Sequence, residues 1–77
     1  MASKPYNGHP SWTAWNVSLW ISNDEGLYRL GLDCLASHKT LDRAALAFMD
    51  QVGTGRTPDG AVYSRSNVRY ALAGLRD

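Results

Sequence analysis

The stretch that decides the fold is SWTAWNVSLWISNDEGLYRL, residues 11–30, because it holds all three tryptophans of the chain, Trp12, Trp15 and Trp20. At about 100° per residue, Trp12, Trp15 and Leu19 fall on one side of a helix. Other apolar residues cover a second side, namely Ala14, Val17, Trp20 and Ile21. A helix that is apolar nearly all round is normally buried. The stretch therefore predicts a tryptophan-rich, central first helix with Trp15 and Trp20 mostly buried, and Trp12 allowed to lie outside.

Short polar residues mark where the first two helices begin. Ser11 or Thr13 can cap the first helix, which we expect to reach about residue 22, and Asn23 or Asp24 can cap the next. From residue 25 to about residue 37 the apolar positions repeat at helical spacing. They are Leu27, Leu30, Gly31, Cys34 and Leu35.

The second half of the chain repeats this pattern. Thr40 is the expected cap of a third helix, which Gly53 ends. A loop with a turn at residues 58–60 follows, and Ser64 or Ser66 then caps a last helix. The apolar positions of that helix are Val68, Ala71, Leu72 and Leu75. We therefore expect an all-α fold, with a small single domain of about four helices in residues 11–77 and an extended arm in residues 1–10.

Composition narrows the classes of function. The chain has 77 residues, of which 44% are hydrophobic, as expected of one globular domain. Its net charge is +1, whereas a nonspecific nucleic-acid binder is clearly basic and a DNA mimic is densely acidic. We therefore expect no tight, direct binding to DNA. No apolar run approaches the ~20 residues needed to span a bilayer, so we expect no membrane association and a cytoplasmic location.

Candidate catalytic chemistry is sparse. The loop GTGRTPDG, residues 53–60, lacks the Gly-Lys-Ser/Thr ending of a phosphate-binding loop and reads as a surface turn. Cys34 lies on an apolar helix face, where a buried structural thiol is a better interpretation than a nucleophile, although His38 could reach it. The chain's two histidines and one cysteine make no credible metal site. We expect a protein that is not an enzyme, with no cofactor and no metal.

A surface for binding another protein is predicted on the last helix. Arg65 and Arg69 are one turn apart, Tyr70 points away from the apolar stripe, and Arg56 comes from the loop before it. Arginine beside tyrosine is typical of interface hot spots, although mixed charge is also the ordinary surface of a small domain. The same helix would be the recognition helix of a DNA-binding regulator, the alternative function. With the arm as the next candidate, the expected partner-binding residues are Arg56, Arg65, Arg69, Tyr70, Trp12 and Tyr6.

Asn16 and Asn23 form a polar strip on the first helix. Because this strip adjoins the tryptophans, we expect its amides to satisfy backbone groups within the fold rather than to bind a partner.

The order Tyr6-Asn7-Gly8, then TAWNVSLWISNDEGLY at residues 13–28, resembles a family of short proteins carried by phages and other mobile elements. The pattern that its members share is Tyr-Asn-Gly, then an aromatic residue, then Trp-Asn-Val-x-Leu-Trp-Ile-x-Asn-Asp-Glu-Gly-Leu-Tyr. The residues of this pattern also have a structural interpretation, in which they form a buried helix, a cap and a tight corner between two helices. They are Trp15, Asn16, Leu19, Trp20, Asn23, Asp24, Gly26 and Tyr28.

Within that family the sequence further resembles anti-CRISPR proteins that act on type I-C systems. The resemblance implies a stoichiometric inhibitor, phage- or mobile-element-encoded, that binds a protein subunit of the crRNA-guided surveillance complex (type I-C Cascade) and blocks target DNA binding. Seven scattered acidic residues do not suit DNA mimicry, so we expect a steric plug. The protein would act in the bacterial cytoplasm as a monomer or a small homo-oligomer.

Overall fold

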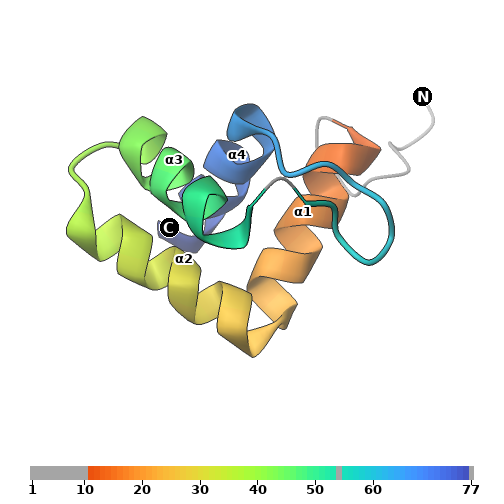
Figure 1. Cartoon of the computed structure of the whole chain (residues 1–77), viewed down its shortest axis with the longest axis horizontal. Coiled ribbons are helices and arrows are strands. Elements are labelled where there is room, and N and C mark those ends of the chain that lie inside the picture. The colour runs from red at the N-terminus through yellow and green to blue at the C-terminus, as the bar shows by residue number, and fades with distance from the viewer. Residues whose placement is uncertain (1–10, 54, 77) are drawn as a thin grey trace, which may run out of the picture.

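The computed structural model describes residues 11–53 and 55–76 of the chain. Four helices follow one another: α1 (Trp12–Asn23), α2 (Glu25–Ser37), α3 (Leu41–Val52) and α4 (Arg65–Arg76). In Figure 1, α1 and α2 meet in a V, α3 returns beside α2, and α4 lies behind them. Within the described residues the one β-type pairing is an isolated antiparallel bridge between Arg56 and Val62. The all-α prediction is confirmed, while the predicted arm, residues 1–10, lies outside the described part.

Each helix begins at a polar cap. Ser11, Asp24, Thr40 and Ser64 each accept a hydrogen bond from the backbone N–H three residues further on, at 2.9–3.2 Å. Where the sequence offered two caps, the structure thus selects Ser11, Asp24 and Ser64. Gly53 ends α3 with a φ of 76°, a value that favours glycine, and its N–H bonds to a carbonyl one turn back. The helix boundaries predicted from caps and apolar spacing are confirmed.

The centre of the fold is α4 rather than α1. α4 and α2 each pack against all three other helices, but the two most extensive helix pairings are those of α4 with α1 and with α3, whereas α1 packs against α2 and α4 alone among the helices. α2 approaches α4 closely at Gly31, where an added Cβ would lie 2.8 Å from Leu75 Cδ1 and 3.1 Å from Leu72 Cδ2. The largest fully buried side chains are Phe48, Ile21, Leu72, Val17, Val68 and Asn16. The expectation of a central first helix is wrong in this respect.

The tryptophans lie at the margin of the core. Trp15 and Trp20 are intermediate in exposure, which agrees with the prediction that they are mostly buried, but neither belongs to the fully buried core. Trp12 is 38% exposed, so the allowance for an exposed Trp12 is confirmed. Within residues 11–53 and 55–76, α2, α4 and the loop that carries Asp59 contact α1, and one face of α1 is fully buried. That face carries Ala14, Asn16, Val17 and Ile21. An apolar circumference therefore does not imply burial on every side.

Candidate functional site

A polar network fastens the loop before α4 to α1. The buried side chain of Asn16 donates from Nδ2 to Asp59 Oδ2 at 2.9 Å and accepts a hydrogen bond from the hydroxyl of Thr57. That hydroxyl oxygen also accepts a bond from the backbone N–H of Ala61, at 3.0 Å. Trp20 Nε1 donates to the same Asp59 Oδ2 at 3.0 Å. We call Asn16, Trp20, Thr57 and Asp59 the Asp59 clamp.

The Asp59 clamp corrects one expectation about α1. Asn16 was expected to satisfy backbone groups, but its side chain bonds to the side chains of Thr57 and Asp59. The hydrogen bonds from Asn16 and Trp20 lower the pKa of Asp59 below its ordinary value, and they outweigh the opposite effect of desolvation. Asp59 is therefore a carboxylate at neutral pH, which is the form that accepts both bonds.

The clamped loop forms one wall of a groove, and α3 forms the other. Figure 1 shows the loop crossing α1 before it turns back toward α4. The groove has a volume of about 530 Å³. Its lining is mainly apolar and comprises Leu46, Met49, Asp50, Gly53, Gly55, Arg56, Val62 and Tyr63. We call it the α3–loop groove.

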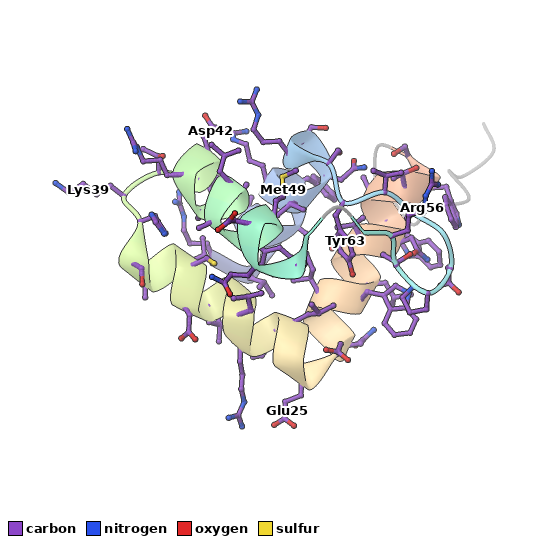
Figure 2. The ribbon with its side chains drawn as sticks, in the orientation of Figure 1. Glu25, Lys39, Asp42, Met49, Arg56 and Tyr63 are labelled. Atoms are coloured by element: carbon purple, nitrogen blue, oxygen red, sulfur yellow. The ribbon has the colours of Figure 1, made fainter. Side chains whose placement is uncertain are left out.

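Two apolar side chains of the α3–loop groove are exposed to solvent. Leu46 is 51% exposed and Val62 is 43% exposed. Figure 2 shows Met49, Tyr63 and Arg56 along this side of the molecule. Exposed apolar residues that line one groove mark an interaction site more often than scattered single residues do.

The floor and rim of the groove differ in chemistry. Tyr63 is buried against Phe48, with ring centroids 6.4 Å apart and planes tilted by 53°. Desolvation, with a smaller effect from the charge of Asp24, raises the pKa of Tyr63, so its phenol is neutral. Asp50 stands on the α3 wall and Arg56 on the loop wall, so opposite charges flank an apolar floor.

The partner-binding residues expected from the sequence do not form one patch. Arg56 lines the α3–loop groove, and its guanidinium donates to the carbonyl of Gly60 at 3.2 Å. Arg69 is exposed on α4 but forms an ion pair with Asp42 of α3, with Nε and Oδ1 2.8 Å apart. Figure 2 shows Asp42 and Arg56 at well-separated places, so Arg56 and Arg69 lie on different parts of the surface.

The remaining expected partner-binding residues are spread over the molecule. Arg65, at the start of α4, and Tyr70 are both exposed. Trp12, at the start of α1, is exposed as well, and Tyr6 lies outside the described residues.

The motif in residues 15–28 builds a corner between two helices. Asp24 alone separates α1 from α2, donating its N–H to the Trp20 carbonyl at 2.9 Å and capping α2 through its side chain. The tight corner and the cap are confirmed. Tyr28, in contrast, is not part of a buried helix face, since its side chain is 40% exposed. Of the other motif residues, Leu19 is half-buried, and Asn23 and Gly26 are exposed.

The sequence analysis missed the apolar rim of the groove. The buried residues of α3 are Ala44, Ala45 and Phe48. Leu46 lies off this stripe, and an apolar residue out of phase with the buried face of its helix was the available signal. Val62 lies in a short segment, and its antiparallel bridge to Arg56 forms only when the loop folds back on itself, so the sequence pattern did not indicate its position. Cys34 is buried, as expected.

No group of three or more His, Cys, Asp or Glu side chains that could hold a metal ion occurs in residues 11–53 and 55–76. No helix in that part of the chain is long and apolar enough to cross a membrane.

The chain belongs to a family of unknown function, DUF7249, whose model matches residues 2–72. No curated protein and no solved structure matches the chain.

Proposed function

We propose that this member of DUF7249 acts by binding another protein, as a stoichiometric inhibitor of a type I-C crRNA-guided surveillance complex. The inhibitor occupies a protein subunit of the complex and thereby keeps target DNA from binding. The resemblance of residues 6–28 to phage-borne anti-CRISPR proteins supplies the target, and the bacterial cytoplasm is the corresponding location. The α3–loop groove is the structural observation that supports a binding role.

The groove has the composition of an interface core. Apolar surface at Leu46 and Val62 is open to solvent, and Met49 is a flexible side chain that adapts to a bound surface. Arg56 and Tyr63 are of residue types that often dominate binding energy. The groove can therefore take an apolar anchor from a partner and orient it by the charges at its rim.

A steric plug suits this surface better than DNA mimicry does. Mimicry needs a dense array of acidic groups, whereas the chain has seven Asp and Glu residues against eight Lys and Arg. Its binding should therefore depend on shape and apolar contact more than on long-range charge.

The test is co-elution of the purified protein with a purified type I-C surveillance complex, followed by target-DNA binding by that complex. We expect the wild type to co-elute and to abolish DNA binding. Val62→Glu places a charge in an apolar contact, and Arg56→Glu reverses the charge at the rim of the groove. Each variant should therefore weaken inhibition at least about tenfold. Leu32→Glu is the matched control, since Leu32 is an exposed leucine on α2, 39% accessible, outside the groove.

The outcomes separate the surface from the function. A protein that neither co-elutes nor inhibits contradicts the proposed function. Inhibition by the wild type that both groove variants retain in full contradicts the groove as the binding surface. The face of α4 with Arg65 and Arg69, and then Trp12 with the arm, would be the next surfaces to test.

A DNA-binding regulator is the second candidate function. One observation favours it, because Arg65, Arg69 and Arg76 all lie on α4 and are exposed. Binding to a labelled duplex at low salt, with an affinity that falls steeply as salt rises, would support this role, because phosphate contacts release counterions. The Arg65→Glu variant should then lose most of that binding.

A further inference from the structure

The outer face of α3 carries a second surface feature, which adjoins the α3–loop groove and shares Leu46 and Asp50 with it. Arg43, Leu46, Ala47 and Asp50 follow one another at i, i+3, i+4 and i+7, so they share one face of the helix. A second hollow, of about 390 Å³, is lined by these four residues and by His38. Leu46 is the most exposed of the large apolar side chains that α3 presents to solvent.

Four residues at this spacing form the hole that receives one side chain in helix-to-helix packing. A leucine is the usual side chain to enter such a hole. The same helix that supplies the hole also supplies an exposed leucine, Leu46, at its rim. We propose that this face binds a second copy of the chain, with α3 packed antiparallel to α3 about a two-fold axis.

The charges on this face are self-complementary. A two-fold axis between Leu46 and Ala47 sets Leu46 opposite Ala47 of the second copy, and Arg43 opposite Asp50 of the second copy. Each dimer then contains two equivalent pairs of opposite charge, as an isologous interface requires. The ion pairs in residues 11–53 and 55–76 join Glu25 to Arg29 and Asp42 to Arg69. Within that part of the chain, Arg43 and Asp50 are therefore not engaged in an ion pair that would compete with this contact.

Sedimentation equilibrium of the purified protein tests the dimer without any partner, so its result is independent of the proposed function. One helix pair is a small interface, so we expect a weak dimer with Kd on the order of 10–100 µM. Arg43→Glu and Asp50→Lys should each raise Kd at least about tenfold, because each places two like-charge pairs in the interface.

Mixing the two single variants gives the decisive measurement. In a heterodimer of Arg43→Glu with Asp50→Lys, both facing pairs are again of opposite charge, so the mixture should dimerise about as well as the wild type. Arg65→Glu, with the same change in charge on α4, is the control and should leave Kd unchanged. Circular dichroism checks that each variant keeps its helices.

Two results would overturn the inference. One is a wild-type protein that stays monomeric at about 1 mM, well above the expected Kd. The other is a mixture of the two variants that dimerises no better than either variant alone.

Discussion

The indole Nε1 of Trp20 lies 3.0 Å from Oδ2 of Asp59, a residue 39 positions away along the chain. Asn16, one helical turn before Trp20, donates to the same oxygen. α1 thus presents two donors on one face to a single carboxylate of the 55–64 loop. This relationship explains why Trp20 stays at the surface of the core, since its N–H needs a polar partner. It also holds one wall of the α3–loop groove in place.

Asn16→Ala tests the Asp59 clamp. The substitution removes the acceptor of the buried Thr57 hydroxyl and a donor to Asp59, so we expect a loss of about 1–3 kcal/mol in the free energy of unfolding. Urea denaturation measures it. Asn23→Ala, at an exposed position in the same helix, is the matched control and should change stability by less than about 0.5 kcal/mol. Equal effects of the two substitutions would contradict a structural role for the clamp.

The lowered pKa of Asp59 predicts a pH dependence of stability. Its ordinary value is 3.8, and the folded value lies below it because Asn16 and Trp20 donate to the charged form. The stabilisation is therefore fully present above pH 3.8 and is lost as the pH falls through the folded value. Urea unfolding at pH values from about 5 to 2 should show a steeper fall for the wild type than for Asp59→Asn. Parallel curves would argue against this origin of the shift.

Gly31→Ala and Gly74→Ala test the close approach of α2 to α4. Both glycines are helical, and alanine favours a helix by up to about 1 kcal/mol. A Cβ at Gly74 meets nothing within 4 Å, whereas one at Gly31 lies 2.8 Å from Leu75. We expect Gly74→Ala to raise the midpoint of thermal unfolding and Gly31→Ala to be less stable than it by about 1–3 kcal/mol. A Gly31→Ala protein as stable as Gly74→Ala would mean that the contact between α2 and α4 accommodates a methyl group without strain.

The ion pair between Arg69 and Asp42 should contribute little to stability. Both side chains are more than half exposed, at 53% and 61%, so a double-mutant cycle with alanine should give a coupling below about 1 kcal/mol. The coupling should fall further at high salt, because ions screen exposed charges. A coupling well above this limit would show that the pair fixes the position of α3 against α4.

Cys34 should react slowly in the folded protein. Burial, with a smaller effect from the charge of Asp33, raises the pKa of its thiol, and the thiolate is the reactive form. We expect alkylation at neutral pH to be at least about tenfold slower than in denaturant. Similar rates in the two conditions would be incompatible with a buried thiol. A native rate above that of a free cysteine would instead indicate an activated nucleophile.

The sequence alone was sufficient for local structure. Thr40 and Gly53 were predicted as a helix cap and a stop, and the other caps were narrowed to Ser11 or Thr13, Asn23 or Asp24, and Ser64 or Ser66, because capping depends on a few neighbouring backbone groups. The apolar stripes of α2, α3 and α4 were recognised for the same reason, since helical periodicity is a property of consecutive residues. Thus the helix count, the helix boundaries and the all-α class were available before any tertiary contact was known.

The tertiary structure alone decided which faces are covered. Helix α1 carries apolar residues around nearly its whole circumference, so its sequence pattern does not predict which face is buried. In the structure the buried face is the one with Val17 and Ile21. The partners of Asn16 lie 41 and 43 residues away, so local pattern could not pair them. The α3–loop groove likewise joins Leu46 to Val62, which come from separate segments. Burial and binding surface depend on long-range packing, and a one-dimensional pattern does not contain that information.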